Sequence, residues 1–118
     1  MEEFMLFIKT EGDHIAGLSP EQQQAHVQKV GDYIGALMKE GRLKGAQPLD
    51  MGGTLVRGRQ GAFKDGPFNE SKEVIVGYFH VLAENLSEAV KIAKENPMFE
   101  ETEAAIEVRP IKRVEGIN

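Results

Sequence analysis

The residues most able to do chemistry are three histidines and an acid-rich stretch, KDGPFNESKE, which spans residues 64–73. An imidazole titrates near neutral pH, and a well-placed carboxylate can take up or release a proton. Asp65 lies near the start of the stretch, and Glu73 ends it. These residue types favour acid–base chemistry, and a rigid, solvated connection into the following strand is the alternative interpretation.

The histidines at positions 14, 26 and 80 follow none of the spacings typical of metal sites, such as H-x-x-x-H or H-E-x-x-H. The chain has no Cys, which excludes disulfides, thiolate ligands and a cysteine nucleophile. Gly52, Gly53 and Gly58 lack the lysine and serine of a phosphate-binding loop. The sequence therefore predicts no metal, no cofactor and no nucleotide.

Each histidine has a different expected setting. His26 falls near the edge of an apolar helical stripe, where a structural histidine is the alternative to a catalytic one. His80 lies mid-strand on the expected face of Tyr78, either to line a cavity between two sheets or to bond to the neighbours of Tyr78, and His14 is expected to be solvated. The predicted catalytic residues are His26, Asp65 and Glu73, and the predicted ligand-binding residues are Phe68, Lys72, Tyr78 and His80.

Length and charge limit the class of protein. A chain of 118 residues predicts one domain, 1–118. The net charge is −5 and the 14 basic residues are scattered, which argues against direct nucleic-acid binding. No apolar run approaches the roughly 20 residues of a membrane span, and the start, MEEF, does not resemble a signal peptide. With no Cys, these features predict a cytoplasmic protein that does not bind membranes.

Two segments, 4–10 and 73–83, read as strands with apolar residues on both faces, which is typical of central strands. Segments around Pro48 and over 104–112 carry a proline or one polar face, which predicts edge strands. A short hairpin is expected within 54–63, with a turn at Asp65-Gly66. Gly77 indicates either a bulge or a close approach by another group. In the second central strand, the residues expected to share a face are Val74, Val76, Tyr78, His80 and Leu82.

Two helices separate these strands. The first is expected to begin at Ser19-Pro20 with a capping box completed by Gln22, and to end at Gly41. Its inward stripe is predicted to be Val27, Val30, Ile34, Leu37 and Met38. The second is expected from about Asn85 to Glu95, with an inward face of Leu86, Ala89, Val90 and Ala93.

The order β-α-β, hairpin, β-α-β predicts an α+β fold of the split βαβ, ferredoxin-like type with an extra hairpin. Two helices cover only one face of a four-stranded sheet, yet the central strands are apolar on both. A second copy of the chain is the simplest cover for the other face. We therefore expect a homodimer with its sheets face to face or closed into a shared barrel.

The stretch DGPFNESKEVIVGYF, residues 65–79, closely resembles the motif of the DGPF branch of the YCII-related family, DGPF-A-E-[ST]-K-E-x-x-G-G-[YF]. Asn69 stands in place of the usual small residue, and Val76 in place of the first of two glycines. The resemblance extends over nearly the whole chain, including the Ser-Pro-Glu helix start and the closing EVRPI.

This resemblance implies a dimeric α+β barrel built from ferredoxin-like protomers. Family members are mostly of uncharacterised function; some are labelled as enzymes and others as linked to transcription initiation. The wider family is noted for a His-Asp pair in a cleft. His26 resembles its histidine, whereas Asn96 occupies the position of its aspartate, so a pair here requires Asp65 or Glu73 to supply the carboxylate.

We therefore expect a small homodimeric protein that binds a small molecule in a pocket between sheet and helices. One alternative is a cofactor-free lyase- or isomerase-like enzyme that uses His and Asp as acid and base. The other alternative is a protein-interaction module linked to transcription regulation. The residue types alone leave these functions open.

Overall fold

The computed structural model describes residues 1–67 and 73–118. Its main sheet is antiparallel, with the strand order β2-β5-β1-β6. Its strands are β1 (Glu2–Glu11), β2 (Leu43–Pro48), β5 (Glu73–Ala83) and β6 (Ala105–Pro110). This is the strand order of a ferredoxin-like fold, and it confirms the predicted central and edge strands.

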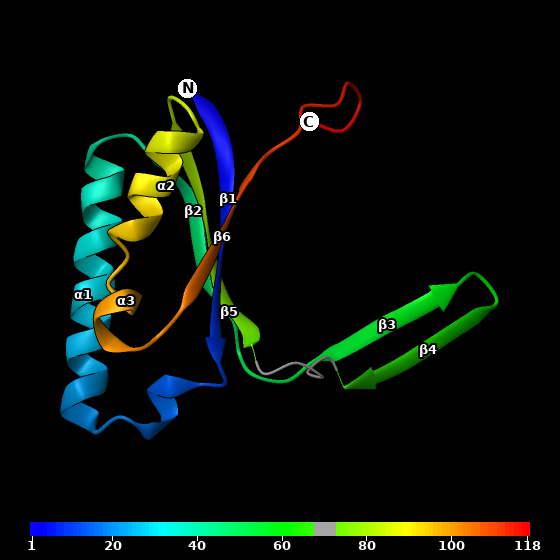
Figure 1. Cartoon of the computed structure of the whole chain (residues 1–118), viewed down its shortest axis with the longest axis horizontal. Coiled ribbons are helices and arrows are strands. Elements are labelled where there is room, and N and C mark those ends of the chain that lie inside the picture. Colours follow the sequence, from blue (N-terminus) through cyan, green and yellow to red (C-terminus); the bar gives the residue numbers. More distant parts are fainter. Residues whose placement is uncertain (68–72) are drawn as a thin grey trace.

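All the helices lie on one face of this sheet (Figure 1). They are the short 3₁₀ helix η1 (His14–Gly17), α1 (Pro20–Lys39), α2 (Leu86–Lys94) and the single turn α3 (Met98–Glu101). The core lies between the helices and the sheet, and its largest fully buried side chains are Phe4, Leu6 and Val81. No helix in the described part of the chain is both long and apolar enough to cross a membrane.

Local signals place α1 as predicted. The Ser19 hydroxyl accepts from the Gln22 N–H, the Gln22 side chain accepts from the Ser19 N–H, and Gly41 follows the helix at φ +70°. The predicted inward stripe was wrong at Val27 and Met38, which are 68% and 63% exposed. The helix turns 100° per residue, and its sheet-facing arc passes through His26, Val30, Tyr33, Ile34 and Leu37.

The second helix, α2, needs a similar correction. Asn85 caps its start, accepting from the Glu88 N–H, as predicted. Leu86, predicted to face inward, is 52% exposed, while Ile92 is buried with Ala89 and Ala93. The first residue of the helix therefore lies beyond the edge of the packed layer.

A bulge in β5 changes which residues share a face. Ile8 pairs with Gly77 and Lys9 with Ile75, which leaves Val76 as an extra residue. The bulge expected at Gly77 is thus confirmed, but the predicted common face of Val74, Val76 and Tyr78 was wrong. Val74 and Val76 lie on the helix side, whereas Tyr78 and the residues at alternate positions after it lie on the other.

The remaining strands, β3 (Thr54–Arg59) and β4 (Ala62–Pro67), form a separate two-stranded hairpin that projects away from the main sheet (Figure 1). The predicted hairpin is confirmed. The predicted turn at Asp65-Gly66 was wrong, because both residues lie within β4 and the chain reverses between Arg59 and Ala62. β3 and β4 pair along their full length, from Thr54 with Pro67 to Arg59 with Ala62, so Asp65 and Gly66 are held in the strand.

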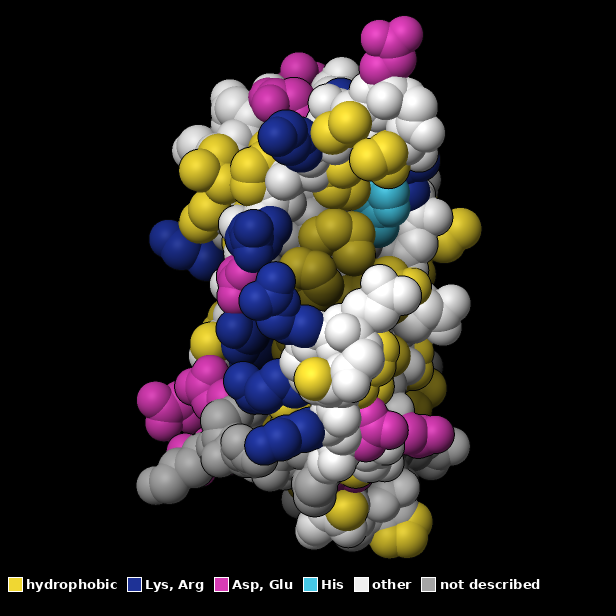
Figure 2. Space-filling view, turned by 90° about the vertical axis from the view of Figure 1, so that its right-hand side faces the viewer, with side chains coloured by type: hydrophobic (Ala, Val, Ile, Leu, Met, Phe, Trp, Pro, Cys, Tyr) yellow, Lys and Arg dark blue, Asp and Glu magenta, His cyan; other side chains and the backbone are white. Residues whose placement is uncertain are grey.

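The face of the main sheet without helices is called here the open face. Its apolar centre comes from alternate residues of β1 and β5: Met5, Phe7, Ile75, Tyr78 and Leu82. Figure 2 shows hydrophobic side chains in a hollow on this side, with a histidine beside them and Lys and Arg side chains along one flank. The predicted two-faced apolar character of the central strands is thus present.

Candidate functional site

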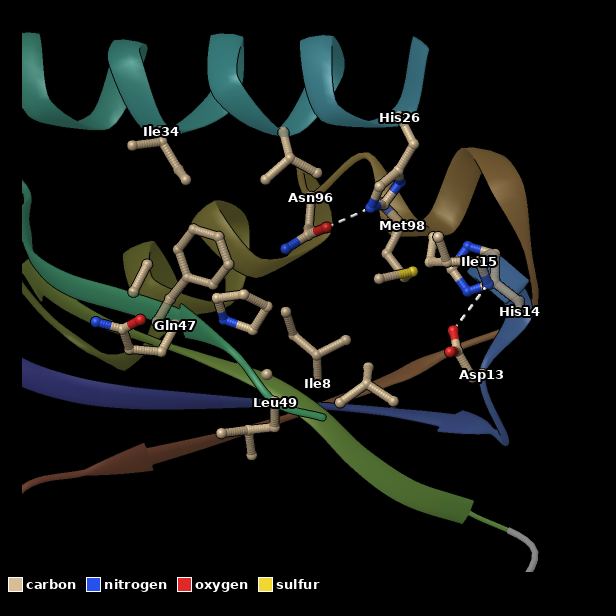
Figure 3. Close-up of a pocket in the computed structure, with 16 residues that line it drawn as sticks. Ile8, Asp13, His14, Ile15, His26, Ile34, Gln47, Leu49, Asn96 and Met98 are labelled. Carbon is tan, nitrogen blue, oxygen red and sulfur yellow. Dashed lines mark hydrogen bonds between the residues drawn. The ribbon is translucent and has the colours of Figure 1, made fainter. Parts of the chain in front are cut away.

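A cavity of about 220 Å³ lies between α1 and the sheet (Figure 3). Its wall is mainly apolar, with side chains from α1, the central strands and the turn after α2. The main apolar contributors are Ile8, Val30, Ile34, Val76, Phe79 and Met98. One end is polar and carries Asp13, His14, His26 and Asn96. The bulge in β5 helps to shape the cavity, because it turns Val76 toward the helices.

His26 forms the firmest polar contact at this end. It projects from the second turn of α1, and its Nδ1 lies 2.5 Å from Oε2 of Glu101, the last residue of α3. The two side chains are only 14% and 13% exposed. An imidazole and a carboxylate this close form a charge-assisted hydrogen bond when the ring nitrogen carries the proton. The pair ties the first helix to the last one.

His14 is the second imidazole, and the prediction that it is solvated was wrong, because its side chain is only 15% exposed. The Asp13 carboxylate accepts from the Ile15 N–H at 3.0 Å and caps η1, which holds His14 in place. The His14 ring meets the His26 ring edge to face, with centroids 5.8 Å apart. Its Nε2 is buried and has no hydrogen-bond partner among the described residues, since Oε2 of Glu101, at 3.7 Å, is too distant for one.

Asn96 stands where the family pattern has its aspartate, and its role here is structural. The residue is 4% exposed, and its Oδ1 accepts from the Met98 N–H at 2.8 Å across the turn between α2 and α3. The carboxylate that reaches His26 is therefore Glu101. Sequence reasoning missed it because Glu101 lies in the acid-rich stretch FEETE, residues 99–103, where nothing distinguishes one acid from its neighbours.

The structure places the other predicted site residues apart from this cavity wall. Tyr78 and His80 lie on the open face, where His80 Nε2 is 2.8 Å from Glu3 Oε1. Asp65 is exposed on β4, paired with Val56, and Glu73 is exposed at the start of β5. Phe68 and Lys72 lie outside the described residues. Of the predicted residues in the described part, His26 is the one that lines the cavity.

Burial changes the pKa values of His80 on the open face and of Tyr33 on α1. Burial lowers the pKa of His80, and the Lys44 ammonium lowers it further, although Lys44, Arg113 and His80 all contact the Glu3 carboxylate. Burial raises the pKa of Tyr33 well above its usual range, so its hydroxyl stays protonated and donates to the Ile92 carbonyl. Tyr33 thus ties α1 to α2 behind the cavity.

The sequence was compared with models of known protein families. The model of the YCII-related domain matches residues 2–115. The chain belongs to the YCII-related domain family. A search of the curated proteins finds no match. The YCII-related match covers the family as a whole, so membership of its DGPF branch stays a prediction.

Proposed function

We propose that this YCII-related protein binds a small, uncharged organic molecule in the cavity between α1 and the sheet. The observation that carries the proposal is the buried Nε2 of His14 without a partner, at the polar end of an otherwise apolar cavity. A buried polar atom left unsatisfied costs about 1–3 kcal/mol. A ligand hydroxyl or carbonyl can supply the missing hydrogen bond.

The size and charge of the cavity narrow the ligand class. A cavity of about 150 Å³ is enough to bind benzene, and this one measures about 220 Å³. Among the described residues that line it there is no Lys or Arg, whereas Asp13 is one of them, and the Glu101 carboxylate contacts His26. A buried anion without a cationic partner is strongly disfavoured. We therefore favour a monocyclic phenol or ketone over the corresponding organic acid.

A pair of variants on α1 tests this. Val30 lines the cavity, so Val30→Phe should fill it. Val27, three residues earlier in α1, points to solvent and is 68% exposed, so Val27→Phe should leave the cavity open. Titration calorimetry with phenol and with benzoate should show binding of phenol, weakened more than about tenfold by Val30→Phe and unchanged by Val27→Phe. Failure of every neutral monocyclic probe, or equal binding by both variants, contradicts the proposal.

Acid–base catalysis is the second candidate function, and the short His26–Glu101 contact favours it. In a cofactor-free lyase or isomerase, His26 would move the proton and Glu101 would orient the ring and balance its charge. A positioned general acid or base contributes about 10²–10⁴-fold. His26→Gln should lower turnover by that factor. It should also lower the free energy of unfolding by about 1–3 kcal/mol, because it leaves the Glu101 carboxylate without its imidazole partner, so turnover is compared at a temperature where both proteins are folded. Asp65→Asn is the parallel test of the acid in the DGPF motif.

We also propose that a second copy of the chain covers the open face. Its centre is apolar, with Ile75 at 43% exposure, and its edge carries charges of both signs on Lys9, Glu107 and Arg109. A patch with both signs can pair with itself across a twofold axis. The family resemblance supports the same dimeric arrangement.

We also propose a cytoplasmic location, because a chain without Cys fits a reducing compartment.

A further inference from the structure

We propose that His14, His26 and Glu101 form a binding site for a divalent first-row transition metal ion. The inference concerns the polar end of the cavity, so it rests on the proposed function and adds an ion to it. It departs from the expectation of no metal, because the three residues come together only through space. They are contributed by three elements: η1, α1 and α3.

The donor atoms are nearly close enough to share an ion. One nitrogen of each imidazole and an oxygen of Glu101 all lie within 4.8 Å of one another. Tetrahedral ligands held about 2.0–2.2 Å from a metal lie roughly 3.4 Å apart, so the donor atoms that lie furthest apart need to approach by at most about 1.4 Å. His26 Nδ1 and Glu101 Oε2, which are 2.5 Å apart, would have to separate by about 0.9 Å to bind the same ion. Changes of this size are within the reach of side-chain rotation.

A second observation points to a missing ligand. His14 Nε2 is fully buried, yet no described residue lies within hydrogen-bond distance of it. The Glu101 oxygen that reaches His26 at 2.5 Å is also the acid atom nearest to this nitrogen, at 3.7 Å. An ion between the two imidazoles would satisfy His14 Nε2 and use the carboxylate charge at the same time.

The donor set selects the kind of ion. Two imidazoles and one carboxylate are typical of zinc sites and of non-haem iron(II) sites, whereas Mg²⁺ and Ca²⁺ prefer oxygen donors throughout. Three protein ligands leave further coordination positions for water or a ligand. His14 and His26 line the cavity, so those positions open toward it.

The ion would change which ligand the cavity accepts. Without it, the polar end offers no fixed positive charge, and an uncharged ligand is favoured. A bound dication supplies that charge and attracts an anionic oxygen, such as a carboxylate or phenolate. It also occupies the nitrogen of His26 that a proton would use. Metal binding and acid–base catalysis by His26 are thus mutually exclusive states of one site.

Titration of the dialysed full chain with Zn²⁺, with Co²⁺ absorption as a second readout, tests the site. We expect one ion per chain, with affinity reduced more than about tenfold by His14→Ala and by Glu101→Gln. Two matched controls should leave it unchanged: His80→Ala, a histidine on the open face, and Glu100→Gln, an exposed acid beside Glu101. No binding, or binding that His14→Ala and Glu101→Gln leave intact, overturns the inference.

A measurement on the wild-type chain avoids any folding defect of the variants. Ring nitrogen shifts recorded by NMR should move on Zn²⁺ addition at His14 and His26 and stay constant at His80. Unmoved shifts at His14 and His26 overturn the metal site. Phenol binding and its loss in Val30→Phe report on the cavity without metal, so either proposal can fail while the other stands.

Discussion

The Glu101 carboxylate lies beside both imidazoles of the cavity, and it is hydrogen-bonded to His26 alone of the two. It is 13% exposed and contacts His26 at 2.5 Å across a sequence separation of 75 residues. A buried carboxylate with a good hydrogen-bonding partner is stabilising, while the same group left alone is costly. His80 and Glu3 repeat the pairing on the open face, with Lys44 and Arg113 beside them.

Replacing Glu101 should therefore affect stability as well as chemistry. Glu101→Gln removes the charge-assisted contact to His26, and we expect the free energy of unfolding to fall by about 1–3 kcal/mol. Urea denaturation followed by circular dichroism measures this change. Glu100→Gln, at an exposed position in the same helix, is the control and should change stability by less than about 0.5 kcal/mol. Equal effects of the two variants would show that Glu101 has no special role.

His80 should make stability depend on pH. Its pKa is lower in the folded protein than the ordinary 6.5, so the unfolded chain takes up this proton more readily. The contribution of His80 is therefore fully present above about pH 6.5 and is lost as the pH falls through the folded pKa. Denaturation at several pH values should show that, as the pH falls, the free energy of unfolding decreases less steeply for His80→Gln than for the wild type. An identical slope would contradict this expectation.

At the scale of elements, the bulge in β5 connects the sheet to the cavity. The extra residue, Val76, turns toward the helices, and Gly77 beside it approaches the neighbouring strand closely. A Cβ atom on Gly77 would lie 3.0 Å from the backbone oxygen of Gln47. Both residues line the cavity. The close pairing of β2 with β5 at this part of the cavity wall therefore requires a residue without a side chain at position 77.

Gly77→Ala should push β2 away from β5. We expect a loss of about 1–3 kcal/mol from overpacking, together with weaker phenol binding, because the cavity wall moves. Gly45→Ala is the matched control in β2, since a Cβ there has open space around it. Chemical denaturation and calorimetry of both variants give the comparison. If Gly77→Ala is as stable as Gly45→Ala, the close approach carries no energetic weight.

At the scale of the whole molecule, the helices cover one face of the sheet (Figure 1) and leave the open face uncovered (Figure 2). The β3–β4 hairpin adds further apolar surface, with Leu55, Val56 and Phe63 at 37%, 62% and 62% exposure. An isolated two-stranded hairpin is marginally stable in water at best. Contact with a second copy would bury apolar side chains of both the open face and the hairpin.

A charge placed on the open face should therefore separate the two copies. Phe7→Glu puts a carboxylate at the centre of β1 on that face, and we expect a monomer at concentrations where the wild type is a dimer. Analytical ultracentrifugation measures the change. Val27→Glu, at an exposed position on α1, is the control and should leave the dimer intact. A wild-type chain that sediments as a monomer at tens of micromolar contradicts the proposed dimer.

The amino-acid sequence by itself determined the strand order, the helix starts at Ser19 and Asn85, and the bulge at Gly77. The strand order follows from the order of the elements along the chain and from which strands are apolar on both faces. The helix starts and the bulge depend on neighbours within a few residues, through caps, periodicity and backbone freedom, so they can be read locally. His26 could be identified as a candidate for the same reason. The tertiary structure alone decided that Glu101 and His14 join it, and that Tyr78 and His80 face away. The contacts of His14 and Glu101 with His26 depend on how α3 and η1 pack against α1, and no local pattern encodes such packing. The bulge itself could be anticipated at Gly77, but the side to which Tyr78 and His80 point follows from the pairing of β5 with β1.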